Sequence, residues 1–216
     1  MPDALLAGAT GLVGQALVQA WATHGTGASL HLLVRRPVSQ PAAACPVHVV
    51  DFSALPALPA AREAYCCLGT TIKVAGSQDA FRAVDHDAVL AFAHAARAAG
   101  VQRLAVVSAL GANPRSSNFY SRVKGETEAA LVSLGFTSLV IARPSLLLGD
   151  RAALGQPERR GELIGQAITQ RIGRLIPGRW RPIAADVVAR ALLRSLQAPA
   201  AGVTVLESAM LQRLGR

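Results

Sequence analysis

Tyr120 and Lys124 are the residues of this sequence whose types and spacing most directly suggest chemistry. They stand four residues apart in the segment "NFYSRVKGETE" (118–128), and the chain of 216 residues contains only two tyrosines and two lysines. On a helix, residues four apart share a face, so the ammonium would lie beside the phenol. A cation beside a phenol favours the phenolate, which makes tyrosine a usable acid or base near neutrality. The alternative is two side chains that merely share a solvated helix face.

A glycine-rich turn follows the first predicted strand. The apolar run "ALLA" (4–7) leads into "GATGLVG", which supplies Gly8, Thr10, Gly11 and Gly14 before a helical pattern begins. Glycines at this spacing permit a tight turn, close approach of the backbone to a pyrophosphate, and close packing of helix on sheet. The free amides and the positive end of the helix would then bind phosphates. The turn predicts dinucleotide binding, although ordinary strand–helix turns can show the same pattern.

The residues after the second and third strands bear on the choice of cofactor. An NAD-preferring site usually has an acidic residue at the end of the second strand, for the ribose 2′-hydroxyl. This chain has Arg35 and Arg36 there, and no acidic residue occurs in 4–50. Arginines suit a 2′-phosphate, so NADP(H) is preferred and NAD(H) stays possible, unless the arginines are only a solvated pair. Asp51 could accept a hydrogen bond from an adenine amino group or cap the next turn.

Strand and helix patterns alternate along the whole chain, which predicts an α/β fold. Strands are expected at 4–7, 29–34, 47–50, 64–68, 103–108, 138–142 and 203–207, and helices at 12–25, 77–99, 118–134, 161–175 and 184–197. Apolar strands alternating with helices indicate a doubly wound parallel sheet covered on both faces. In such sheets the ligand crevice lies at the carboxyl ends of the strands. Ser108 ends the fifth strand there and could polarise a substrate carbonyl.

Length and composition point to one globular domain spanning 1–216. No apolar run is long enough to span a membrane, and the N-terminus carries Asp3 and lacks a basic leader, so we expect a cytoplasmic protein. Cys45, Cys66 and Cys67 match no zinc or disulfide spacing, and the five histidines are scattered, so we expect no metal.

The net charge of +9 fits an anionic ligand, a phosphate-bearing cofactor or a charged surface. No nucleic-acid motif accompanies this charge, so nucleic-acid binding is disfavoured. A small-molecule substrate is the expected partner, and the oligomeric state is expected to be a monomer or a homodimer.

Together the glycine turn, Ser108 and the Tyr120–Lys124 pair resemble the short-chain dehydrogenase/reductase superfamily. "GATGLVG" is similar to its extended and atypical branches, and the blocks "LGTT", "NFYSRVKGE" and "ARPSLLLGDR" resemble more narrowly the Tat-interacting-protein-like atypical reductases. The resemblance implies a Rossmann fold of about seven parallel strands that binds NADPH.

The resemblance also implies particular site residues. Tyr120 and Lys124 would be the active pair, with Ser108 as the third catalytic residue. The expected cofactor contacts are Gly8, Thr10, Gly11, Leu12, Val13 and Gly14 at the pyrophosphate, Arg35 and Arg36 at the 2′-phosphate, Asp51 and Phe52 near the adenine, Leu68, Gly69, Thr70 and Lys124 along the ribose, and Arg143, Pro144 and Ser145 beside the nicotinamide.

Two positions differ from the pattern of the superfamily. Relatives usually carry a second serine where this chain has Ala109, and many carry an asparagine where it has Asp85. The expected substrate-side region, 143–182, is short, so the substrate pocket should be small or open. We assign Glu126 and Glu128 to a solvated helix face.

Three functions are compatible with these features. The first is an NADP(H)-dependent oxidoreductase acting on an unidentified small molecule. The second is an NADP(H)-binding regulatory or assembly protein with little catalysis. This function is compatible with Asp85 and Ala109, the two positions that differ from the pattern of the superfamily. The third is an enzyme resembling sugar-nucleotide epimerases or dehydratases, which the short substrate-side region disfavours.

Overall fold

A seven-stranded parallel sheet forms the centre of the molecule. The computed structural model describes residues 3–23, 28–38, 45–148 and 180–216. The strand order is β3-β2-β1-β4-β5-β6-β9, so it reverses between β1 and β4. This is the doubly wound Rossmann topology, which places the ligand crevice at that reversal, so the predicted fold class is confirmed. The strands are β1 (Ala4–Ala7), β2 (Leu30–Val34), β3 (Val47–Val49), β4 (Glu63–Cys66), β5 (Arg103–Val107), β6 (Ser138–Arg143) and β9 (Gly202–Glu207).

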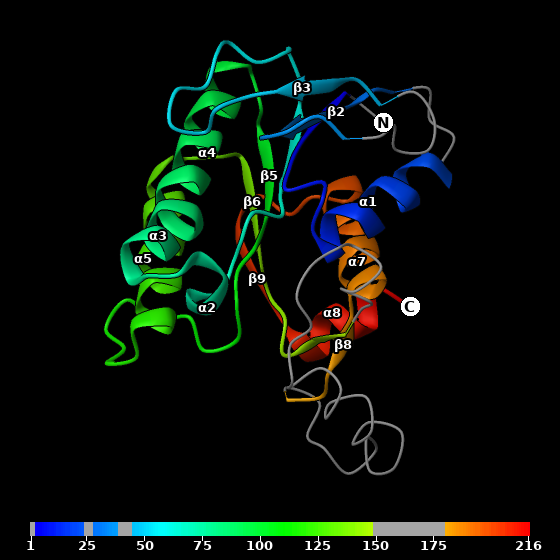
Figure 1. Cartoon of the computed structure of the whole chain (residues 1–216). Helices are drawn as coiled ribbons and strands as arrows, with labels where there is room; N and C mark the ends of the chain where they lie inside the picture. Colours follow the sequence, from blue (N-terminus) through cyan, green and yellow to red (C-terminus); the bar gives the residue numbers. More distant parts are fainter. Residues whose placement is uncertain (1–2, 24–27, 39–44, 149–179) are drawn as a thin grey trace.

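Helices cover both faces of this sheet (Figure 1). One face carries α1 (Leu12–Thr23), α7 (Ala185–Gln197) and α8 (Ser208–Leu214); the other carries α3 (Gln78–Arg82), the π-helix η1 (Ala83–Asp87), α4 (Ala88–Ala98) and α5 (Phe119–Ser133). The strands β7 (Leu147–Leu148) and β8 (Ile183–Ala184) form a separate two-stranded sheet. The short helix α2 (Ile72–Ala75) precedes α3.

The strands are apolar because each one contributes to two hydrophobic cores. In β1, Ala4 and Leu6 pack with α1 and α7, whereas Leu5 and Ala7 pack into the core beneath α4 and α5. All four are fully buried, so alternate side chains fill opposite faces of the same sheet. This two-sided burial fixes the carboxyl ends of the strands at one edge, where the predicted site residues follow.

The predicted elements agree with the observed ones to within a few residues, with several exceptions. The helix expected over 77–99 is interrupted by the π-turn of η1, and α2, β7, β8 and α8 were not predicted. The expected helix at 161–175, and most of the region 143–182, lie outside the described residues. Within the part of the chain that the structure describes, no helix is long and apolar enough to cross a membrane, and no cluster of ligating side chains could hold a metal.

An acidic residue lies on the buried stripe of the helix that carries the π-turn. Phe81, Asp85, Val89 and Phe92 follow helical spacing, and none is more than 2% exposed. A π-turn is often found at functional sites, and here it contains Asp85. A buried carboxylate needs a cation or a hydrogen-bond donor inside the protein, so Asp85 indicates a buried polar contact at this point of the fold.

The edge strand β3 is joined to β2 by a pair of histidines. His31 Nδ1 and His48 Nε2 are 3.0 Å apart, and the ring centroids are 5.2 Å apart. Partial burial lowers the pKa of His48, and the neighbouring His31 lowers it further.

We predict that this histidine pair makes the fold less stable in mild acid. The pKa of His48 is lower in the folded than in the unfolded chain, so the unfolded chain takes up the proton more readily. The contribution of His48 to the free energy of unfolding is therefore fully present above its unfolded pKa of about 6.5, and it is lost as the pH falls from that value through the folded pKa. Urea unfolding at pH 7.5 and 5.5 should show a smaller acid-induced loss of stability for His48→Gln than for the parent chain. An equal loss in both proteins would contradict this role.

Candidate cofactor and active site

The glycine turn after β1 packs so tightly that side chains are excluded at two positions. Gly8 has φ of +85°, and a Cβ there would lie 2.5 Å from the carbonyl carbon of Cys67. A Cβ on Gly14 would lie 2.1 Å from the carbonyl oxygen of Gly8. Gly11 differs, because its Cβ would meet only that same oxygen, at 3.5 Å. Gly8 and Gly14 therefore seat α1 on the sheet, whereas Gly11 leaves open space at the start of the helix.

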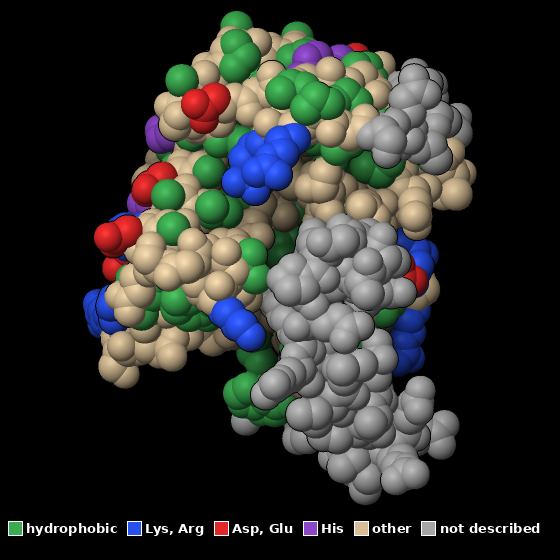
Figure 2. Space-filling view, viewed as in Figure 1, with side chains coloured by type: hydrophobic (Ala, Val, Ile, Leu, Met, Phe, Trp, Pro, Cys, Tyr) green, Lys and Arg blue, Asp and Glu red, His purple; other side chains and the backbone are tan. Residues whose placement is uncertain are grey.

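A cavity of about 1060 Å³ opens at this turn, along the carboxyl ends of the strands. Figure 2 shows a hollow in this face of the molecule, with basic side chains at its upper rim. Its volume is slightly above the range of roughly 300–1,000 Å³ that is typical of small-molecule and cofactor sites. The predicted site residues that line it are Gly8, Thr10, Gly11, Leu12, Val13, Arg35, Asp51, Phe52, Leu68, Gly69, Thr70, Ser108, Tyr120 and Lys124.

The ends of β2 and β3 supply the part of the cavity expected to bind the adenosine. Arg35 lines it directly after β2, with no acidic residue between it and the turn. Asp51 lines it after β3, and its Oδ1 accepts a hydrogen bond from the Ser53 amide at 2.9 Å. That hydrogen bond lowers the pKa of Asp51 and means that the carboxylate already caps the local turn. One carboxylate oxygen of Asp51 thus has a structural role, while the residue still faces the cavity.

Lys124 forms a buried ion pair with Asp85 on the cavity wall. Its Nζ lies 2.7 Å from Asp85 Oδ1, and the two side chains are 7% and 0% exposed. Asp85 Oδ2 accepts the Thr70 amide at 2.7 Å, which ties the loop after β4 to the same carboxylate. Burial lowers the pKa of Lys124, but Asp85 and Tyr120 outweigh burial and raise it overall. The lysine is thus held charged on the cavity wall.

Tyr120 lies in the first turn of α5, where the helix start fixes its position. The Asn118 side chain caps this helix by accepting the Ser121 amide at 3.1 Å. The ring of Tyr120 packs against that of Phe81, with centroids 5.3 Å apart. Tyr120 and Lys124 both line the cavity, so the spacing seen in the sequence does place the pair on one face.

Ser108 is bound to a second buried charge pair, formed by Glu128 and Arg143. The Ser108 hydroxyl donates to Glu128 Oε1, and Arg143 binds the same carboxylate through Nε at 3.0 Å and Nη2 at 2.5 Å. Glu128 is only 6% exposed, so its assignment to a solvated helix face was wrong. The reason is that Arg143, the last residue of β6, lies next to Glu128 of α5 and neutralises its carboxylate. Glu207 adds a contact to Arg143 at 3.2 Å.

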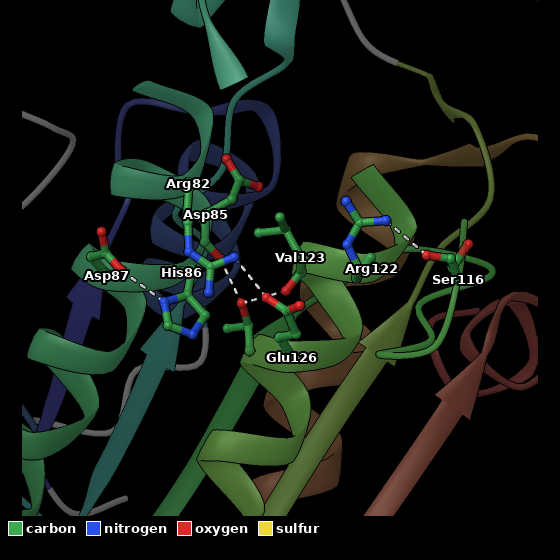
Figure 3. A network of polar contacts seen from close by, with 9 residues as sticks. Arg82, Asp85, His86, Asp87, Ser116, Arg122, Val123 and Glu126 are labelled. Carbon is green, nitrogen blue, oxygen red and sulfur yellow. Dashed lines mark hydrogen bonds and ion pairs between the residues drawn. The ribbon is translucent and has the colours of Figure 1, made fainter. Parts of the chain in front are cut away.

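A different acidic residue of α5 does face outward. Glu126 pairs with Arg82 across the surface at 2.6 Å, with both side chains partly exposed. Figure 3 shows this pair, and shows the Asp85 side chain directed away from it. The outer and inner faces of the α5–η1 contact therefore carry separate charge pairs.

Five predicted cofactor residues are not among the described residues that line the cavity: Gly14, Arg36, Arg143, Pro144 and Ser145. Gly14 packs beneath the turn and Arg143 binds Glu128. The Pro144 carbonyl accepts the Leu110 amide, and the Ser145 hydroxyl donates to the Arg181 carbonyl. Asp85 lines the cavity but was not predicted as a site residue. Two sequence signals point to it: it stands where many members of the superfamily carry an asparagine, and it lies on an apolar helical stripe.

The fold, the glycine turn and the tyrosine–lysine pair together define an NAD(P)-binding Rossmann protein of the atypical short-chain dehydrogenase/reductase type. A family model described as NAD(P)H-binding matches residues 8–168. The chain belongs to this NAD(P)H-binding family, which confirms the resemblance found in the sequence.

Two relatives align with most of the chain. Protein HTATIP2 of Rattus norvegicus is 38% identical over 176 residues, which cover 78% of this chain and 69% of that protein. The mitochondrial protein FMP52 of Eremothecium gossypii is 33% identical over 217 residues, covering 96% of this chain and 94% of that protein.

Solved structures with lower sequence identity share the fold. MoeE5 in complex with UDP-glucose and NAD matches with a TM-score of 0.73 at 20% identity, covering 94% of this chain and 75% of that one. The UDP-glucose 4-epimerase of Thermus thermophilus in complex with NAD matches with a TM-score of 0.69 at 16% identity, covering 98% and 81%. At these identities the likeness establishes the architecture of the chain and not its substrate.

We predict that two glycine substitutions in the turn have separable effects. Gly14→Ala forces a Cβ against the Gly8 carbonyl and should destabilise the fold by about 1–3 kcal/mol. Gly11→Ala should leave stability within about 1 kcal/mol of the parent chain, because an added Cβ would meet only the Gly8 carbonyl oxygen. It should weaken dinucleotide binding about tenfold or more, because Gly11 lines the cavity at the turn expected to contact the pyrophosphate.

Thermal unfolding and nicotinamide fluorescence titration would measure the two effects. Equal stability losses for both variants would contradict the packing difference. Unchanged cofactor affinity in Gly11→Ala would contradict the assignment of the turn to the pyrophosphate.

Proposed function

We propose that the protein is an NADP(H)-dependent oxidoreductase that acts on a small molecule. The observation that carries this proposal is that one cavity is lined both by the glycine turn and by Tyr120 and Lys124. A dinucleotide bound along the turn would extend along the strand ends toward the tyrosine. The cofactor supplies hydride transfer when bound, and the residues of the chain supply orientation and the proton.

In this proposal each residue of the pair has a distinct task. Tyr120 exchanges a proton with the substrate oxygen, which requires its hydroxyl to lie within hydrogen-bond reach of that oxygen. Lys124 stands on the next turn of α5, and its ammonium interacts electrostatically with the Tyr120 hydroxyl. Its ammonium has three N–H donors and uses one toward Asp85, so donors remain for a ribose hydroxyl.

The preference for NADP(H) rests on Arg35. Arg35 lines the cavity directly after β2, where an NAD-preferring site would carry an acidic residue. Arginine binds phosphate through charge-assisted and often bidentate hydrogen bonds. We therefore propose that Arg35 contacts the 2′-phosphate, and that NAD(H) binds more weakly.

A second candidate function is a cofactor-binding regulatory protein with little turnover. The observation that favours it is the hydrogen bond from Ser108 to Glu128, which occupies the hydroxyl hydrogen that a substrate carbonyl would need. Ala109 adds no second hydroxyl next to it. This candidate predicts NADP(H) binding without measurable turnover across a broad carbonyl panel. The cytoplasmic location and the substrate-side role of 143–182 stay predictions.

For the oxidoreductase, Tyr120→Phe should lower kcat by about 10²-fold or more while the NADPH dissociation constant changes little. The phenyl ring keeps the packing against Phe81 but cannot exchange a proton. Steady-state rates over a panel of aldehydes and ketones, with fluorescence titration of NADPH, would measure both quantities. A fully active variant would remove Tyr120 from the chemistry, whereas an inactive parent chain that binds NADPH would favour the regulatory candidate.

Arg35→Ala should weaken NADPH binding by about 10- to 100-fold, as expected for lost hydrogen bonds to a charged group. Binding of NADH should change little, because NADH lacks the 2′-phosphate. Arg62→Ala is a matched control, since Arg62 is an exposed arginine that is not among the described residues lining the cavity. Equal losses for both cofactors, or equal effects of the two substitutions, would refute the proposed contact.

A further inference from the structure

The charge of Lys124 depends on its immediate surroundings because the side chain is buried. Only 7% of it is exposed, and burial opposes a charged amine strongly enough to lower the pKa of deeply buried lysines by several units. A lysine in such a position becomes neutral unless an anion lies close to it. The groups that face Lys124 therefore decide whether it can act as a cation at all.

Four titratable groups interact with Lys124 or line the small inner cavity beside it. Asp85 of η1 lies 2.7 Å from Nζ, and Tyr120 of α5 and Cys66 of β4 are close enough to interact electrostatically. Glu128 lines a small cavity of about 10 Å³ together with Lys124 and Asp85. Each of these groups could in principle supply the compensating negative charge.

Asp85 is the only one of the four that is free to do so. Burial raises the pKa of the Cys66 thiol to about 12, so this thiol stays neutral. The Glu128 carboxylate is already neutralised by Arg143, which binds it through two nitrogens. In the proposed function, the phenol of Tyr120 exchanges a proton with the substrate, so it cannot also serve as a permanent negative charge. Among the described residues, Asp85 Oδ1 has no hydrogen-bond donor other than this ammonium.

We infer that Asp85 is the counter-ion that keeps Lys124 protonated and directed at the cavity before any cofactor binds. It is a positioning residue, because it acts through Lys124 and through the Thr70 amide. An asparagine in its place could still accept the Thr70 amide but would carry no charge. Aspartate and asparagine at this position therefore differ in the charge state that they impose on the lysine. The inference deepens the proposed function, although its test needs no turnover.

The composition of the chain makes the charge state of Lys124 directly measurable. Lys73 is the only other lysine, and it is exposed on α2. Protein labelled with ¹⁵N-lysine therefore gives two Nζ signals, which Lys73→Arg would assign. In the parent chain, Lys124 should keep its proton to high pH, because Asp85 stabilises the ammonium. In Asp85→Asn, the Lys124 signal should show loss of the proton at a clearly lower pH than in the parent chain.

Asp87→Asn is the matched control for this experiment. Asp87 lies in the same π-turn, but its side chain is 62% exposed and contacts His86 instead of Lys124. Figure 3 shows Asp87 directed toward His86. This substitution removes the same charge from the same turn and should leave the Lys124 titration where it is in the parent chain. If Asp85→Asn does not change the pH at which Lys124 loses its proton, or if Asp87→Asn changes that pH by the same amount, the counter-ion assignment is wrong.

A double substitution covers the case in which Asp85→Asn does not fold. An uncompensated buried ammonium is strongly destabilising, whereas loss of both charges is tolerated far better. The counter-ion assignment therefore predicts that Asp85→Asn/Lys124→Met is more stable than Asp85→Asn alone, as measured by urea unfolding or circular dichroism. If the double variant is equally unstable or unfolded, Asp85 is needed for a reason other than the charge of Lys124, and the assignment fails.

Discussion

A buried charge must be compensated within the protein, and in this chain that constraint joins the elements around the cavity. The Asp85–Lys124 pair connects η1 to α5, and the second oxygen of Asp85 holds the loop after β4 through the Thr70 amide. The hydroxyl of Thr127 adds a bond from α5 to the Asp85 carbonyl at 3.0 Å. Three segments far apart in the sequence are thereby fixed relative to one another. This junction lies on the cavity wall, next to Tyr120 and Lys124.

The sheet and the glycine turn could be predicted from the sequence because their signals are local. Both faces of β1 are buried, so its sequence is uniformly apolar, and Gly8 follows at once with the positive φ that its close approach to Cys67 requires. Tyr120 and Lys124 could be predicted for the same reason, since residues four apart on a helix share a face. In each case the pattern and its structural cause lie within a few residues.

The charge pairs could not be predicted, because each joins residues distant in sequence. Glu128 reads as one more acidic residue on a polar helix, and only the fold brings Arg143 from the end of β6 beneath it. Asp85 is less extreme, since its place between Phe81 and Val89 on a buried stripe already required a partner. The sequence alone could not say which cation that partner would be. The π-turn likewise has no local signal that we can identify in "AVDHD".

The two buried pairs have opposite consequences for the chemistry of the site. Asp85 leaves Lys124 charged and able to influence Tyr120, whereas Glu128 takes the hydroxyl hydrogen of Ser108. A substrate oxygen placed between Tyr120 and Ser108 would therefore find one proton donor and one lone-pair acceptor. Such an arrangement suits a substrate whose own O–H or N–H group donates a hydrogen bond to the Ser108 oxygen. It suits a simple carbonyl less well, because the carbonyl oxygen would then face the Ser108 oxygen with no hydrogen between the two acceptors. The two positions that differ from the superfamily pattern thus bear differently on the proposed function. Asp85 would support the proposed Tyr120–Lys124 pair, whereas Ala109 supplies no hydroxyl that could replace the one that Glu128 binds.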